Sequence, residues 1–253
     1  MFMQLPFKWS ASCIMRGHRM RRFFVLGAMG LCLISRVSAV PLLTLDIAGG
    51  TYDSGSQTII ASGDPFTLYA LGNTLAGKVS GTYYIAAAII PQTVNPPATD
   101  FGSFKINGIT YSAANMSYGN PPASVTKSSL DLQSHGIYDT HYVEIAFTFD
   151  SSHTAALYNS ADNPGGLVQD ANGAMIFEDF DVDVTGLAAG YEVHFDFYNL
   201  GRDKRGDTMV KDFAPFSKDA QSGSVSVADS SSTMILLGMA MLAVEGMRRR
   251  FAR

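Results

Sequence analysis

Three segments of the chain alternate between apolar and polar side chains, and this period of two constrains the fold more than any other feature. The segments are 141–150, 177–184 and 191–198. In an extended strand, consecutive side chains point to opposite faces, so a period of two gives one apolar face and one polar face. Each segment is therefore predicted to be a β-strand with one buried face.

Several other segments are also expected to form strands. They are 42–48, 58–61, 66–71 and 82–90. The last of these is apolar on both faces, so we expect a central strand that is covered on each side. Asn107-Gly108 predicts a tight turn between strands at 101–106 and 109–112. Only 154–158 indicates a helix, and weakly.

Turn-forming residues separate these segments, and no internal repeat or second domain is visible. Eight or nine short strands divided by such turns are typical of a β-sandwich. The sequence thus predicts an all-β protein with a single two-sheet β-sandwich, jelly-roll-like, over 40–222. Signals at the two ends of the chain are predicted to flank this core.

The N-terminal 39 residues have the organisation of a secretory signal peptide. Four arginines between positions 16 and 22 precede twelve largely apolar residues, 23–34, and small residues follow up to Ala39. This order predicts export and cleavage between Ala39 and Val40. A buried N-terminal helix is the alternative. Cys13 and Cys32 lie in the segment that would be removed, so the mature core has no disulfide and must be held together by packing or a metal.

The C-terminal 20 residues, 234–253, combine an apolar segment with a basic end. Residues 234–244 are apolar all round, which suits lipid, and four arginines lie between 248 and 253. The apolar segment has 11 residues, fewer than the roughly 20 that span a bilayer. We expect an apolar anchor helix with its arginines on the cytoplasmic side. A terminal helix packed on the protein is the alternative.

A short polar motif precedes this segment, within a spacer at 223–233. Together they resemble the exosortase-type C-terminal sorting signals of Gram-negative bacteria, the PEP-CTERM class, in the variant named for a Val-Pro-Asp-Ser-Gly motif. The residues that fit are Val227, Asp229, Ser230, Ser232 and Thr233, whereas Ala228 and Ser231 replace the proline and the glycine. The resemblance implies an exosortase-type processing enzyme as partner, a membrane-anchored precursor, and a host that makes exopolysaccharide.

The region between the signals is strongly acidic. Residues 40–227 carry 8 basic and 20 acidic side chains, a net charge of −12. Such a charge favours solubility and repels nucleic acid and anionic lipid. Nucleic acid is therefore excluded as a partner of the core, whereas cations are attracted to it.

The core also resembles an exported bacterial family called choice-of-anchor N, whose members join one core to alternative C-terminal anchors. The resemblance rests on 45–53, 66–70, 180–184 and 213–222. It implies an anchored extracellular domain and supplies no catalytic residues.

Asp179, Asp181 and Asp183 form the most suggestive group of ligand-type side chains. On a strand they share one face at steps of about 6.5–7 Å. Three like charges so placed repel one another unless water screens them or a cation bridges them. Calcium prefers carboxylate and carbonyl oxygens, so a calcium site is one hypothesis. A solvated outer face is the alternative, and no other cofactor is predicted.

Other chemistry has weaker support. His194 lies between Glu192 and Asp196 on the polar face of its strand, and we expect surface or hydrogen-bonded histidines rather than a zinc site. The chain has no nucleophile elbow, phosphate loop or dinucleotide fingerprint. A glycosidase pair drawn from Glu144, Glu178 and Glu192 stays open, because its separation cannot be read from a sequence. The many tyrosines leave glycan stacking open as well.

These observations favour an exported protein that is anchored in the envelope or released from it. The expected role is structural, as an extracellular-matrix component, without catalysis. The alternatives are a calcium- or glycan-binding module and, less favoured, a polysaccharide-active enzyme.

Overall fold

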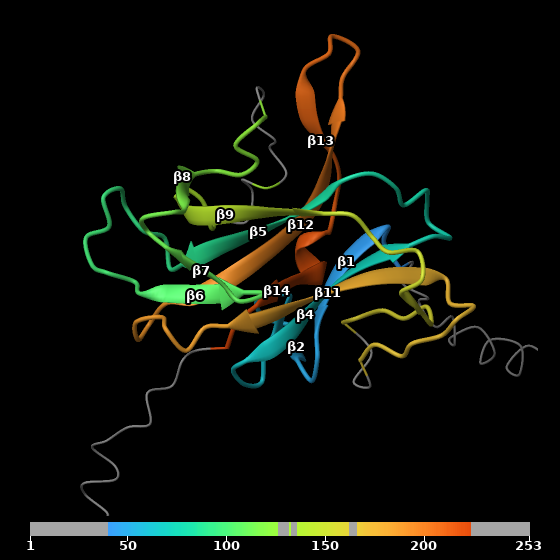
Figure 1. Cartoon of the computed structure of the whole chain (residues 1–253), viewed down its shortest axis with the longest axis horizontal. Helices are drawn as coiled ribbons and strands as arrows, with labels where there is room; N and C mark the ends of the chain where they lie inside the picture. Colours follow the sequence, from blue (N-terminus) through green and yellow to red (C-terminus); the bar gives the residue numbers. More distant parts are fainter. Residues whose placement is uncertain (1–39, 126–131, 133–135, 162–165, 224–253) are drawn as a thin grey trace, which may run out of the picture. The chain divides into compact units, whose positions relative to one another are not determined.

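The computed structural model describes residues 40–125, 132, 136–161 and 166–223 of the chain. The chain divides into two units between Ala39 and Val40, and all the described residues belong to the second unit. Their fold is all-β with two sheets, as the alternation predicts (Figure 1).

The first sheet, sheet A, has six strands among the described residues. In spatial order they are β1 (Leu43–Ile47), β4 (Phe66–Asn73), β11 (Met175–Asp183), β6 (Ser103–Ile106) and β7 (Ile109–Ser112), with β10 (Thr154–Ala155) paired to β11. All of its pairings are antiparallel. The alternating segment 177–184 is thus a central strand of this sheet.

The second sheet, sheet B, has eight described strands. In spatial order they are β2 (Thr51–Asp53), β3 (Thr58–Ile60), β14 (Asp219–Gln221), β12 (Glu192–Arg202), β5 (Tyr83–Ile90), β9 (Thr140–Phe147) and β8 (Ser117–Gly119), with β13 (Thr208–Phe213) paired to β12. Only the β14–β3 pairing is parallel. A 3-10 turn, η1 (Phe216–Lys218), leads into β14.

One hydrophobic core joins the inner faces of the two sheets. Sheet A contributes Leu45, Leu68 and Val182, and sheet B contributes Ile85 and Phe195, all of them fully buried. Along β11 and just past its end, the core holds every second residue, Phe180, Val182 and Val184, so the period of two in the sequence corresponds to the wall of the core.

Two local predictions are confirmed. β5 lies between β12 and β9, and all of its residues from Ile85 to Ile89 are buried, as expected for a strand covered on both sides. The hairpin of β6 and β7 closes at Asn107 and Gly108, whose φ angles of 49° and 78° are those of a primed turn.

The weak indication of a helix at 154–158 is wrong. Thr154 and Ala155 form β10 and pair with Ile176 and Met175 of β11. Ala155 is fully buried in this pairing. Tertiary pairing with a long strand outweighs the small helical preference of so short a segment.

The outer face of sheet B differs most from expectation. The polar positions of β12 were expected to face solvent or to hold surface histidines, but His194 and Asp196 are buried. A second apolar cluster covers this face, formed by Leu132, Val210 and Tyr198 with Ala86 beneath them. β12 is therefore enclosed on both faces over much of its length.

No helix in the described part of the chain is long and apolar enough to cross a membrane. Residues 1–39 and 224–253 lie outside the described residues, as do the predicted signal peptide and anchor helix.

Candidate functional site

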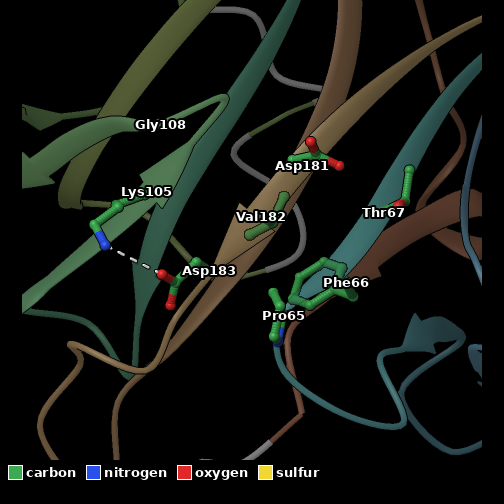
Figure 2. A pocket seen from close by; sticks show the side chains of 8 residues that line it. All are labelled: Pro65, Phe66, Thr67, Lys105, Gly108, Asp181, Val182 and Asp183. Carbon is green, nitrogen blue, oxygen red and sulfur yellow. Dashed lines mark hydrogen bonds and ion pairs between the residues drawn. The ribbon is translucent and has the colours of Figure 1, made fainter.

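A hollow of about 460 Å³ opens on the outer side of sheet A (Figure 2). Its lining consists of Pro65, Phe66, Thr67, Lys105, Gly108, Asp181, Val182 and Asp183. The strand register explains the arrangement, because Asp181 pairs with Thr67 of β4 and Asp183 pairs with Lys105 of β6. Two carboxylates and one ammonium group thus border an apolar floor.

Asp183 is already engaged within this hollow. Lys105 Nζ lies 3.2 Å from its Oδ2, and the backbone N–H of Thr185 donates to its Oδ1 over 3.0 Å. Hydrogen bonds from Thr185, followed by the bond and charge of Lys105, hold the pKa of Asp183 below its usual value. Asp183 is therefore ionised at neutral pH, and its charge is matched by a lysine.

The three aspartates of the calcium hypothesis share one face of β11, as predicted, but they border two different hollows. Asp181 and Asp183 line the hollow of Figure 2. Asp179 instead lines a hollow of about 360 Å³ together with His153 and Asp170. The described residues do hold one group of His, Asp and Glu side chains whose ligand atoms converge, but these three are not in it.

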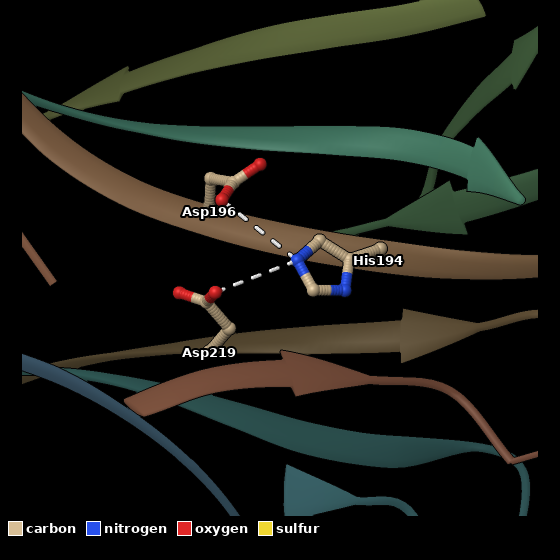
Figure 3. Close-up of side chains that lie close together, drawn as sticks. All are labelled: His194, Asp196 and Asp219. Carbon is tan, nitrogen blue, oxygen red and sulfur yellow. Dashed lines mark ion pairs between the residues drawn. The ribbon is translucent and has the colours of Figure 1, made fainter. Parts of the chain in front are cut away.

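That convergent group is a buried triad, which consists of His194, Asp196 and Asp219 (Figure 3). His194 and Asp196 are two residues apart on β12, so they share a face. Pairing of Phe195 with Ala220 places Asp219 of β14 directly opposite Asp196. Three ligand-type side chains from two neighbouring strands therefore meet at one point.

The triad is almost completely shielded from water. His194, Asp196 and Asp219 are 3%, 1% and 1% exposed. His194 Nε2 lies 3.7 Å from Asp196 Oδ1 and 3.7 Å from Asp219 Oδ2. The imidazole nitrogen is thus equidistant from two carboxylates that face each other across the strands.

The electrostatics of the triad follow from this geometry. Burial lowers the pKa of His194, but its interactions with Asp196 and Asp219, whose carboxylate oxygens lie 3.7 Å away, outweigh burial and raise it to about 10. Without a metal ion, His194 is therefore an imidazolium at neutral pH. One positive and two negative groups then leave a net charge of −1 on the triad.

Tyrosines connect the triad to the rest of the covered face. The phenol of Tyr138 donates to Asp196, and the phenol of Tyr198 donates to Glu144 Oε1 over 2.6 Å. Burial and the neighbouring carboxylates raise the pKa values of Tyr138 and Tyr198 well above normal. Both phenols therefore stay neutral donors.

The three glutamates of the glycosidase hypothesis lie in separate environments. Glu144 accepts hydrogen bonds from Tyr198 and from the backbone N–H of Ala123, and it lies on β9 of sheet B. Glu178 is on β11 of sheet A, and Glu192 accepts a hydrogen bond from Gln221.

The histidine predictions are partly confirmed. His141 is hydrogen-bonded, with Nδ1 lying 2.7 Å from Thr93 Oγ1, and burial lowers its pKa. His194 was recognised beside Asp196, but its burial and its partner Asp219 were missed. The sequence carries a signal for the first pair, a His-x-Asp pattern on one strand, and none for the third residue.

The predicted processing residues are almost all outside the described part of the chain. Ala39 and the sorting-motif residues Val227, Asp229, Ser230, Ser232 and Thr233 lie there. Val40 is described, and its carbonyl oxygen accepts a hydrogen bond of 3.0 Å from Asn73 Nδ2.

Compared with models of protein families, with curated proteins and with solved structures, the chain matches none. The resemblances to PEP-CTERM signals and to the choice-of-anchor N core therefore stay predictions.

Proposed function

We propose that this protein is an exported structural component of the envelope or extracellular matrix of an exopolysaccharide-producing Gram-negative bacterium, without catalysis. The observation that carries the proposal is that an all-β fold lies between the two predicted sorting signals. Among the described residues, its first strand begins at Leu43 and its last strand ends at Gln221, between the predicted signal peptide and the predicted spacer. A domain placed between two sorting signals is what an exported and anchored protein requires.

The physical character of the domain supports the same role. Both cysteines lie outside it, and a continuous core between two sheets stabilises it instead. Its net charge of −12 keeps such a domain hydrated and soluble. These properties suit a protein that persists outside the cell and does not bind nucleic acid.

Processing would follow the order of the signals. The signal peptide is removed after Ala39, and residues 234–253 hold the precursor in the membrane. An exosortase-type enzyme then cuts near Val227–Thr233 and leaves the domain attached at the envelope or released. Exopolysaccharide is the partner that such a location makes available.

Protease protection in intact cells tests the location. A tag placed after Gly206, in the β12–β13 turn, should be removed by external protease from cells that make the full chain. A chain that ends at Thr233 should instead appear in the medium, because it lacks the anchor. A tag that external protease does not remove, on a cytoplasmic chain that retains residues 1–39, contradicts the proposal.

Glycan binding at the hollow of Figure 2 is the second candidate. The hollow has the volume of a small-ligand site, and Asp181 and Lys105 at its border offer polar groups for hydrogen bonds. The hypothesis that this hollow binds calcium has less support, since Asp183 is already paired with Lys105. Titration calorimetry with oligosaccharides from the host polymer should give binding that Lys105→Ala weakens at least tenfold and Lys78→Ala leaves unchanged.

Two further measurements address the remaining alternatives. If calcium binds at Asp181, millimolar calcium raises the melting temperature and Asp181→Ala abolishes the rise. If the protein degrades polysaccharide, incubation with the host polymer releases soluble sugar. No release and no calcium shift leave the structural role in place.

A further inference from the structure

The buried triad of His194, Asp196 and Asp219 has a role that the structural proposal does not use. Two carboxylates directly opposite each other across neighbouring strands repel. Each is at least 98% shielded in its side chain, where the cost of an uncompensated charge is largest. A positive group between the carboxylates, either an imidazolium or a metal ion, reduces this repulsion.

Counted over these three side chains alone, a divalent cation offsets both carboxylate charges, whereas a proton on His194 offsets one. A neutral imidazole, two carboxylates and one M²⁺ ion sum to zero. The same groups with a proton on His194 sum to −1. Of these two occupants, the metal ion therefore leaves the smaller net charge in a buried site.

The distances also fit a metal. Zinc binds imidazole nitrogen and carboxylate oxygen at about 2.0–2.2 Å, so ligand atoms at the corners of its tetrahedron are about 3.3–3.6 Å apart. The two separations from His194 Nε2 are 3.7 Å each. An N–H···O hydrogen bond is shorter, about 2.7–3.2 Å.

The ligand types and their surroundings distinguish between metals. Calcium and magnesium prefer oxygen ligands alone, whereas one nitrogen and two oxygens suit zinc and its first-row neighbours. Tyr138 donates its phenol to Asp196 and so orients that carboxylate from outside the triad, as supporting groups do around metal ligands. The triad therefore differs in kind from the calcium site expected on β11.

We propose that His194, Asp196 and Asp219 bind a divalent transition-metal ion of the zinc class that ties β14 to β12. The three side chains supply three of the four ligands of a tetrahedral ion, whose role is to link the two strands. The ion fixes the C-terminal strand of the described fold, which pairs with β12 on one side and β3 on the other. In an exported domain whose cysteines lie outside the fold, it supplies the cross-link that disulfides provide elsewhere.

Metal analysis of the purified full-length chain in detergent tests the proposal. Zinc is the probe, and inductively coupled plasma mass spectrometry counts it after removal of loose metal on a desalting column. About one zinc per chain is expected. Cobalt in place of zinc should give the visible absorption of a tetrahedral site, and chelation should lower the melting temperature by several degrees.

Two variants and one matched control locate the ion. Asp219→Asn and His194→Gln should each lose the zinc and the cobalt absorption. His141→Gln removes another histidine of sheet B that is equally buried, at 3% exposed, and should keep both. Circular dichroism verifies that each variant is folded, and Asp219→Asn, which changes one oxygen to an amide, is the less disruptive of the two.

Two results would overturn the proposal. One is a wild-type protein with less than 0.2 zinc per chain after incubation with excess zinc and an unchanged melting temperature. His194 would then be an imidazolium held between two carboxylates. The other is stoichiometric zinc that Asp219→Asn and His194→Gln both retain, which would place the ion elsewhere in the chain.

Discussion

Removal of one aromatic ring from the core should destabilise the fold far more than removal of a similar ring at its edge. Phe197 is 1% exposed, and its ring centroid lies 5.8 Å from that of Tyr83 and 5.8 Å from that of Phe147. A buried Phe→Ala change costs about 3–5 kcal/mol, because apolar area is lost and a cavity remains. We therefore expect Phe197→Ala to lower the free energy of unfolding by about 4 kcal/mol.

Urea denaturation of the full-length chain, followed by far-ultraviolet circular dichroism, measures this loss. Phe213→Ala is the matched control, since Phe213 is only partly buried and packs at the edge of the covered face. Its cost should be about 1–2 kcal/mol. Typical domains are stable by about 5–15 kcal/mol, so the difference is measurable. A loss below about 2 kcal/mol for Phe197→Ala, or equal losses for both variants, would refute the argument that Phe197 packs within the buried core.

Two further perturbations test other parts of the structure. The pKa values of Tyr138 and Tyr198 are raised in the folded state, so their contribution to stability is fully present below the unfolded pKa of about 10 and is lost as pH rises above it. The free energy of unfolding should fall by on the order of 1–2 kcal/mol between pH 10 and 11, and the phenolate absorbance of these two tyrosines should appear only as the protein unfolds; phenolate absorbance from all the tyrosines before unfolding would contradict this. Gly173→Ala should destabilise the protein by at least about 2 kcal/mol, because the new Cβ would lie 1.9 Å from the carbonyl oxygen of Ala155, whereas a Cβ at Gly63 meets nothing within 4 Å and Gly63→Ala should be near neutral in thermal melts.

The fold class was predictable because strands and tight turns have local sequence patterns. Alternation at 177–184 and 191–198 identifies β11 and β12, and Asn107-Gly108 identifies the β6–β7 turn. The short helix expected at 154–158 was wrong since pairing with β11 is a long-range contact that local preference does not report.

Only two of the three residues of the buried triad could be identified from the sequence, because a long-range strand pairing supplies the third. His194 and Asp196 are two residues apart, and their shared face follows from strand geometry. Asp219 joins them only because β14 inserts between β12 and β3, a pairing that no local pattern specifies. Tyr138, which precedes β9 and lies far from β12 in the sequence, also donates a hydrogen bond to Asp196.

In the hollow on sheet A, the sequence identified the aspartates but not the lysine beside them. Asp181 and Asp183 were identified by spacing alone, and the structure does place them together. Lys105 was not anticipated, because its position beside Asp183 depends on the register between β6 and β11. That lysine offsets the charge of Asp183, so the hollow attracts a cation less than the two aspartates alone would.

The intact mass of the protein extracted from its native envelope tests the central claim most directly. The account predicts a chain that begins at Val40 and ends between Val227 and Thr233, with any attached glycan as an added mass. A mass that includes residues 1–39 would contradict export. A mass that retains residues 234–253 would contradict processing at the sorting motif and would identify a protein that stays anchored by its tail.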